Sequence, residues 1–107
     1  MTKVIIAGAA GRMGRRIGYM VNEHQGLQVA AGFEVPGNPE IGSDMGELGG
    51  YGTIGVPVAN DLGAVIDQGD VIIDFTFHEA TMKIARQAAE HRTAMVIGTT
   101  GFTAEDL

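Results

Sequence analysis

Three glycines, Gly8, Gly11 and Gly14, follow an apolar run at residues 3–8 (KVIIAG), and they constrain the fold more than any other feature of the chain. A short apolar run rich in β-branched residues is typical of a strand that is buried on both faces of a parallel sheet. Glycines at such positions allow a tight turn out of the strand, close approach of an anion to the backbone, and close packing of the following helix. The strand, turn and helix together predict an anion-binding site at the helix N-terminus.

Glu34 adds a second feature to this predicted anion site. It lies twenty positions after Gly14, at the end of the next alternating run, where a carboxylate can bind the ribose hydroxyls of a dinucleotide. The turn departs from the G-x-G-x-x-G pattern because Ala10 stands where the second glycine would be. A glycine turn can be purely structural, and a lone acidic residue is most often an exposed carboxylate, but the two together favour dinucleotide binding.

Changes in the period of the apolar residues predict alternating strands and helices after the first strand. The expected elements are a helix from Met13 to about Gln25, a strand at 27–34, a short strand at 56–58, a short helix at 61–66, a strand at 70–76, a helix to about His91, a buried strand at 94–98 and a helix start at 103–106. Residues 35–55 hold seven glycines and two prolines without periodicity, which predicts a long mobile loop. The order predicts an α/β fold, a single Rossmann-like, doubly wound parallel sheet that is truncated within these 107 residues.

Helical spacing also assigns the buried face and the first residue of the helices. In the first helix the residues at helical spacing are Met13, Ile17, Val21 and His24, with Met20 alongside, and in the last long helix the residues expected to face the core are Met82, Ala85 and Ala89. Thr76 and Glu79 form a capping box that opens this last helix, so Thr76 is first an N-cap and second a cofactor contact. Asn60 or Asp61 is the expected cap of the short helix.

Composition limits the partners and the compartment. The chain has no cysteine, which rules out a disulfide framework or a thiolate metal site and fits a reducing compartment. Its formal net charge of −6 argues against nucleic acid or an anionic membrane as a partner. The N-terminal apolar stretch is too short for a signal peptide or a membrane span. We therefore expect a cytoplasmic domain that binds no metal, and of its histidines only His78, near a strand end, remains a candidate contact.

The ends of the predicted strands carry most of the remaining polar residues, in the stretches GAAGRMG, FE, DFT and GTTG. Ligands of such sheets bind beyond the carboxyl ends of the strands, so these stretches are expected to line one crevice. Arg12, Arg15 and Arg16 interrupt an acidic background there, and one of them is expected to contact the cofactor. Thr99 and Thr100, between glycines, are either turn residues or contacts.

Four stretches, GAAGRMGR, GSDMGEL, DVIIDFT and MVIGTTGF, occur in the order and at the intervals of the N-terminal domain of bacterial dihydrodipicolinate reductases, and the chain resembles that domain over essentially its whole length. The resemblance implies an oxidoreductase of lysine and diaminopimelate biosynthesis. Such enzymes reduce a cyclic dihydropyridine dicarboxylate, or its hydroxylated precursor, by hydride transfer from NADH or NADPH. The full-length relative is expected to be a homotetramer.

The resemblance also implies roles for individual residues. The pyrophosphate is expected on Gly8, Ala9, Ala10, Gly11, Arg12 and Met13, the adenosine ribose on Glu34, and the nicotinamide end on Phe75, Thr76, Gly98, Thr99 and Thr100. No catalytic residue is implied, because the family's substrate-binding domain lies downstream of these residues. Residues 1–107 alone are therefore expected to be inactive.

Two positions depart from the family pattern. Members that favour NADPH place an arginine directly after the acid, where this chain has Val35, so NADH is expected to be preferred over NADPH. After DFT the family often has a basic residue and a proline, where this chain has Phe77 and His78. One alternative is a non-catalytic, redox-sensing dinucleotide module. Another is a short-chain reductase, but neither Tyr19 nor Tyr51 has the lysine four residues away that such an enzyme needs.

Overall fold

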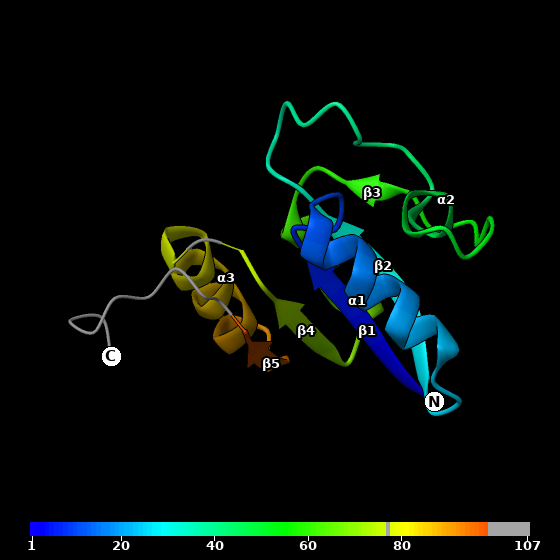
Figure 1. The fold of residues 1–107 in the computed structure, drawn as a ribbon. Coiled ribbons are helices and arrows are strands. Elements are labelled where there is room, and N and C mark those ends of the chain that lie inside the picture. Colours follow the sequence, from blue (N-terminus) through cyan, green and yellow to red (C-terminus); the bar gives the residue numbers. More distant parts are fainter. Residues whose placement is uncertain (77, 99–107) are drawn as a thin grey trace.

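A computed structural model describes residues 1–76 and 78–98 as one parallel five-stranded sheet in the order β3-β2-β1-β4-β5 (Figure 1). The strands are β1 Thr2–Ala7, β2 Leu27–Phe33, β3 Val58–Ala59, β4 Val71–Asp74 and β5 Ala94–Ile97. The helices are α1 Arg12–Glu23, α2 Met45–Gly49 and α3 His78–Glu90, with 3-10 turns η1 Leu62–Ala64 and η2 Ile66–Gln68. The strand order confirms the predicted α/β, Rossmann-like fold and places the reversal of strand order at β1, as in doubly wound sheets.

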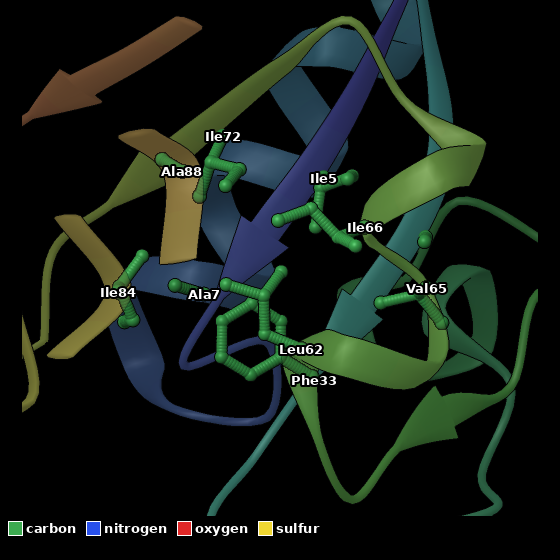
Figure 2. Close-up of a cluster of buried hydrophobic side chains, with 10 residues drawn as sticks. Ile5, Ala7, Phe33, Leu62, Val65, Ile66, Ile72, Ile84 and Ala88 are labelled. Atoms are coloured by element: carbon green, nitrogen blue, oxygen red, sulfur yellow. The ribbon is translucent and has the colours of Figure 1, made fainter. Parts of the chain in front are cut away.

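The central strand, β1, is buried on both faces, as its apolar run predicts. Val4 and Ile6 face the side covered by α1 and α2 and belong to a cluster with Val21 and Met45. Ile5 and Ala7 face the opposite side, in the cluster drawn in Figure 2 with Phe33, Leu62, Val65, Ile66, Ile72, Ile84 and Ala88. Full burial of one such aliphatic side chain stabilises the fold by about 1.5–3 kcal/mol, so β1 ties the two layers together.

The first helix, α1, approaches the sheet through glycines. Gly14 and Gly18 are buried together with Val21, whereas Met13 is 47% exposed. A Cβ on Gly14 would lie 2.1 Å from the carbonyl oxygen of Gly8, which leaves no room for a side chain. The predicted helix is confirmed. Of the residues at helical spacing, Val21 is buried and Met13 is exposed, because the helix touches the turn backbone to backbone.

The buried face of α3 is displaced by one residue from the predicted one. The buried residues are Thr81, Ile84 and Ala88. Met82 is 49% exposed and Ala89 is also exposed, so their predicted inward positions are wrong. A shift of one residue rotates a helix face by about 100°. The rotation turns Thr81 toward the end of β4, where its Oγ1 lies 3.4 Å from that of Thr76.

Three shorter predictions are corrected. The strand predicted at 94–98 forms as β5, but Val96 and Ile97 are 54% and 49% exposed, because β5 is the edge strand of the described sheet. The helix predicted at 61–66 is replaced by η1 and η2, and the side chain of Asp61 makes no capping bond. The short strand begins at Val58, where it pairs with Gly32 of β2. The helix start predicted at 103–106 lies outside the described residues.

The segment predicted as a long mobile loop is organised around one carboxylate. Asp44 caps α2 through the Glu47 N–H at 3.1 Å. It also accepts the N–H groups of Ile54, Gly55 and Val56 at 3.1, 2.7 and 3.1 Å. Hydrogen bonds from one side chain to scattered backbone groups leave no periodicity in the sequence. The expectation of an unbroken loop at residues 35–55 is corrected by α2, and its mobility stays a prediction.

Two side chains fasten the same segment to the core. Met45 is 3% exposed, and a Cβ on Gly32 of β2 would lie 2.3 Å from its sulfur. A Cβ on Gly18 of α1 would lie 2.5 Å from the Tyr51 hydroxyl oxygen. Burial, together with the negative charge of Asp44, raises the pKa of Tyr51 to about 12, so this phenol stays neutral. Glycines in β2 and α1 thus make room for side chains from residues 35–55.

Replacing Asp44 by alanine should accelerate amide hydrogen exchange at Ile54, Gly55 and Val56 and leave β1 and β4 protected, because only the former amides lose their acceptor. Exchange measured residue by residue tests this. Asp61→Ala is the matched control, since that carboxylate makes no capping bond. Exchange at these amides that is equally fast in the unsubstituted protein would instead support the mobile loop that the sequence predicts.

Lowering the pH should weaken the hydrogen bonds that Asp44 accepts from residues 54–56. Partial desolvation raises the pKa of Asp44, but its backbone hydrogen bonds from Ile54, Glu47, Gly55 and Val56 outweigh this and hold the pKa below its usual 3.8. Since the folded-state pKa is lower than the unfolded one, the contribution of Asp44 is complete well above pH 3.8 and is lost as the pH falls through the folded-state value. Protection of these amides should drop in that range, and the Asp44→Ala variant should show no such step.

Replacing Gly14 by alanine should lower the free energy of unfolding by about 1–3 kcal/mol, the usual cost of overpacking. The matched control is Gly11→Ala, because a Cβ there would meet only the Gly8 oxygen at 3.4 Å and its φ of −72° suits any residue. The control should lose less than about 1 kcal/mol. Urea unfolding followed by circular dichroism compares the two, and equal losses would show that the close approach of α1 is not the constraint.

Candidate functional site

The carboxyl ends of β1, β2 and β4 meet at the turn that follows β1. Gly8 has a φ of 70°, the left-handed conformation that glycine adopts without strain. The N–H groups of Gly8 and Ala9 both donate to the Phe33 carbonyl, at 3.0 and 3.1 Å, and the Gly11 N–H donates to the Gly8 carbonyl at 3.1 Å. The turn is therefore fixed to the end of β2 and closed on itself, with a defined backbone shape.

Glu34, the predicted ribose ligand, contacts this turn directly. Its Oε1 accepts the Ala10 N–H at 2.9 Å, and its own N–H donates to the Ala59 carbonyl at 2.9 Å. The bond to Ala10 uses one of the two carboxylate oxygens. Glu34 is only partly buried. The structure thus brings together the two features that the sequence singled out separately, the glycine-rich turn and the acid at the end of the second strand.

The N-terminus of α1 is suited to an anion. Gly11 is the N-cap and has no side chain with which to cap the helix, so the first N–H groups of α1 are not covered by their own cap. Arg12 and Met13 are exposed beside it. Of the three arginines predicted to lie here, Arg15 contacts the turn itself, because its Nε donates to the Ala10 carbonyl at 2.7 Å.

The end of β4 contacts the turn from the other side. A Cβ on Gly8 would lie 2.9 Å from Cγ2 of Thr76. The Thr76 N–H and hydroxyl both donate to Oδ1 of Asp74, at 2.8 and 2.5 Å. Asp74 is 0% exposed and was not predicted as a functional residue, although a carboxylate at the end of the apolar run VIID is a signal for one.

The predicted nicotinamide residues lie close together in the described part of the chain. The Phe75 ring occupies the place of a side chain at Gly98, since a Cβ there would lie 2.2 Å from the ring. The Gly98 N–H donates to the Asp74 carbonyl at 2.7 Å. Thr99, Thr100 and the side chain of His78, which the sequence also marks as candidates, lie outside the described residues.

The two halves of the candidate site meet at Gly8, with Glu34 on the β2 side and Thr76 on the β4 side. Among residues 1–76 and 78–98, no three acidic or histidine side chains are grouped in a way that could hold a metal ion. Within the same ranges, none of the helices has the length and apolar character needed to cross a membrane.

Comparison with known proteins agrees with this arrangement. Residues 2–107 match the family described as "Dihydrodipicolinate reductase, N-terminus". Over 107 residues the chain is 58% identical to a 4-hydroxy-tetrahydrodipicolinate reductase of Desulfotalea psychrophila and 45% identical to one of Syntrophus aciditrophicus. The matches cover 100% of this chain and 40% of each relative, so the chain spans less than half the length of these relatives.

Solved structures show the same likeness. A dipicolinate-bound dihydrodipicolinate reductase from Paenisporosarcina sp. TG-14 superposes with a TM-score of 0.72 at 28% identity, covering 99% of this chain and 40% of that one. An amine dehydrogenase from Mycobacterium smegmatis gives a TM-score of 0.75 at 23% identity, covering 90% and 29%, and shares the fold. These 107 residues belong to the dihydrodipicolinate reductase family and correspond to its N-terminal part.

Proposed function

We propose that this chain is the NAD(P)H-binding domain of a 4-hydroxy-tetrahydrodipicolinate reductase, in which hydride passes from reduced nicotinamide to a cyclic dihydrodipicolinate-type substrate in lysine and diaminopimelate biosynthesis. The family and the names of its relatives support this activity. The observation that carries the proposal is the hydrogen bond from the Ala10 N–H to Glu34, because it joins a phosphate-type turn to a ribose-type acid. No finding favours a non-catalytic module.

The shape of the turn fits a dinucleotide. The pyrophosphate is assigned to the turn from Gly8 to Met13, where the N–H groups of residues 8–11 are bonded within the protein and those at the start of α1 are left for the anion. The carboxylate of Glu34 accepts hydrogen bonds from ribose hydroxyls. Phe75, Thr76 and Gly98, with Thr99 and Thr100 beyond them in the chain, are assigned to the nicotinamide end. The bound cofactor supplies the hydride, and these residues bind and orient it.

The substrate side of the reaction is assigned to residues outside this chain. We assign no catalytic acid and no carboxylate clamp to residues 1–107, which form the cofactor domain. A small dicarboxylate substrate, a homotetrameric full-length protein and a cytoplasmic location complete the proposal. The dipicolinate that the Paenisporosarcina reductase binds is consistent with such a substrate.

Glu34 should make NADH the preferred cofactor. A carboxylate that binds the 2′- and 3′-hydroxyls repels a 2′-phosphate, and the next residue, Val35, is 63% exposed and offers no positive charge. We expect NADH to bind about tenfold more tightly, a difference of ~1.4 kcal/mol. Glu34→Gln removes the charge and should bring the two affinities toward parity. Titration of both cofactors at matched ionic strength, followed by nicotinamide fluorescence, measures the ratio.

Val35→Arg should shift the same ratio toward NADPH, because it places a guanidinium beside the ribose site. Gln28→Arg is the matched control: it adds the same charge to an exposed position at the start of β2, away from the strand ends, and should leave the ratio unchanged. If both variants shift the ratio of NADH to NADPH affinity equally, the adenosine ribose does not bind at the end of β2. Tighter binding of NADPH by the unsubstituted protein would show that Arg12 or another cation outweighs Glu34.

Residues 1–107 produced alone should bind NADH without oxidising it. Hydride transfer requires the substrate to be held against the nicotinamide, and such positioning is equivalent to effective molarities of ~10⁵ M or more. Substrate-dependent loss of NADH absorbance, compared with the full-length protein, tests this. Turnover by the 107-residue chain above a buffer blank would contradict the assignment of substrate binding to another domain.

A further inference from the structure

Arg15 is the fourth residue of α1, and its side chain folds back onto the turn that follows β1. Its backbone N–H makes the ordinary helical bond to the Gly11 carbonyl at 3.0 Å. Its Nε reaches one residue further back and donates to the Ala10 carbonyl at 2.7 Å, a length typical of a charged donor. Arg15 is partly buried, whereas Arg12 and Arg16 are exposed. The Arg15 side chain is therefore part of the turn, although its backbone belongs to the helix.

No ion pair accounts for the position of the Arg15 guanidinium. It pairs with no carboxylate of residues 1–76 and 78–98, and the hydrogen bond that its side chain makes there is the one to Ala10. Holding so long a side chain in one orientation costs conformational entropy, which indicates that this bond has a use. The backbone at Arg15 is supported by α2, because a Cβ on Gly49 would lie 3.0 Å from the Arg15 carbonyl oxygen. Ala10 is thus bonded to a well-supported part of α1.

Ala10 lies between Arg15 and Glu34 and is bonded to both. Its carbonyl accepts from Arg15, and its N–H donates to Oε1 of Glu34 at 2.9 Å. The N–H groups of residues 8, 9 and 11 donate to backbone carbonyls instead. Two side chains therefore set the orientation of Ala10, and loss of the bond to Arg15 would leave its N–H free to turn away from Glu34.

The Glu34 carboxylate depends on this N–H for its orientation. Its side chain has several rotatable bonds and is only partly buried, so it can adopt several rotamers unless a partner holds it. The Ala10 N–H is that partner. A carboxylate that is already in its binding orientation loses less entropy when a ligand binds, which increases affinity. A donor that is itself held by a second hydrogen bond fixes the carboxylate better than a free donor does.

We propose that Arg15 is a positioning residue for cofactor binding, which acts through the Ala10 backbone to hold the Glu34 carboxylate in place for the adenosine ribose. This inference rests on the proposed function, because it requires a dinucleotide whose ribose binds Glu34. It assigns to Arg15 a hydrogen bond within the protein and no contact with the cofactor.

Two substitutions in the full-length protein separate the Nε hydrogen bond from the charge. Arg15→Met keeps the length of the side chain but has no donor, whereas Arg15→Gln carries an N–H on the atom that replaces Nε; both lack the charge. Arg15→Met should weaken NADH binding about tenfold, roughly the value of one hydrogen bond, and Arg15→Gln less than about threefold. Both variants should fold, because Arg, Met and Gln have nearly equal helix propensities. Equal losses in the two variants would overturn the inference.

A double-mutant cycle tests whether Arg15 acts through Glu34. In a Glu34→Ala background there is no carboxylate to position, so Arg15→Met should change NADH affinity less than about twofold. Additive losses would show that Arg15 acts independently of Glu34, and they would overturn the inference. The matched control is Arg86→Met, which removes the same charge from an exposed position on α3 and should leave NADH affinity unchanged in both backgrounds.

NADPH distinguishes positioning from a direct contact with the cofactor. A guanidinium that binds the 2′-phosphate would make Arg15→Met weaken NADPH binding more than NADH binding. A guanidinium that positions Glu34 should have the opposite effect, because the carboxylate favours the ribose hydroxyls and repels the 2′-phosphate. The ratio of NADH to NADPH affinity should therefore fall in Arg15→Met, and a rise would overturn the inference.

Amide hydrogen exchange at Ala10 tests the link without a cofactor. Arg15→Met should accelerate this exchange about tenfold in the ligand-free protein, because an unbonded carbonyl lets the Ala10 N–H open more often, and Arg15→Gln should leave it within about threefold. Unchanged exchange in Arg15→Met would overturn the inference. Failure of the unsubstituted protein to bind either NADH or NADPH would instead overturn the proposed function.

Discussion

The contact between α1 and the turn after β1 is the constraint on which both the fold and the candidate site depend. With no side chain at Gly14, the helix backbone rests on the Gly8 carbonyl and on Ala9. The same turn is bonded to the Phe33 carbonyl at the end of β2. The helix N-terminus is consequently held above the strand ends, and its N–H groups point toward the place where a ligand of the sheet binds. This one close approach thus fixes both the position of α1 against the sheet and the position of the anion site at its N-terminus.

This geometry explains why the turn departs from the usual glycine spacing at Ala10. The Ala10 N–H is bonded to Glu34 and the Ala10 carbonyl accepts from Arg15, so both backbone polar groups of this residue are occupied by the protein. Its side chain is 8% exposed and packs inward. No ligand needs to approach the backbone at Ala10, so a Cβ at this position does not obstruct binding. Gly11, whose Cβ would meet only the Gly8 oxygen at 3.4 Å, is the position that stays open.

Sequence patterns predicted the positions of the strands and helices better than the face that each helix buries. Continuous apolar runs located β1 and β4, because a strand buried on both sides needs such a run, and an alternating run located β2. The inward face of α1 could not be read from hydrophobicity, since Gly14 and Gly18 fill it and leave Met13 outside. The organisation of residues 35–55 was missed for another reason: it comes from Asp44, whose hydrogen bonds to scattered backbone groups leave no period in the sequence. Within the site, the turn and Glu34 follow from spacing, whereas the hydrogen bonds that Thr76 donates to the buried Asp74 have no signal in the spacing.

The net charge of the chain does not describe the donors and acceptors at the candidate site. The chain carries −6 overall, yet the proposed cofactor contains an anionic pyrophosphate, so the attraction must be local. Repulsion between exposed charges is largely screened beyond about 8 Å at physiological ionic strength, whereas contacts with N–H groups are not. Along the strand ends the groups run from an acceptor at Glu34 to the N–H donors at the start of α1. The adenosine half of a dinucleotide has the complementary order, from ribose hydroxyl donors to phosphate acceptors. Recognition then depends on where each donor and acceptor is fixed, and the acidic surface elsewhere does not oppose it.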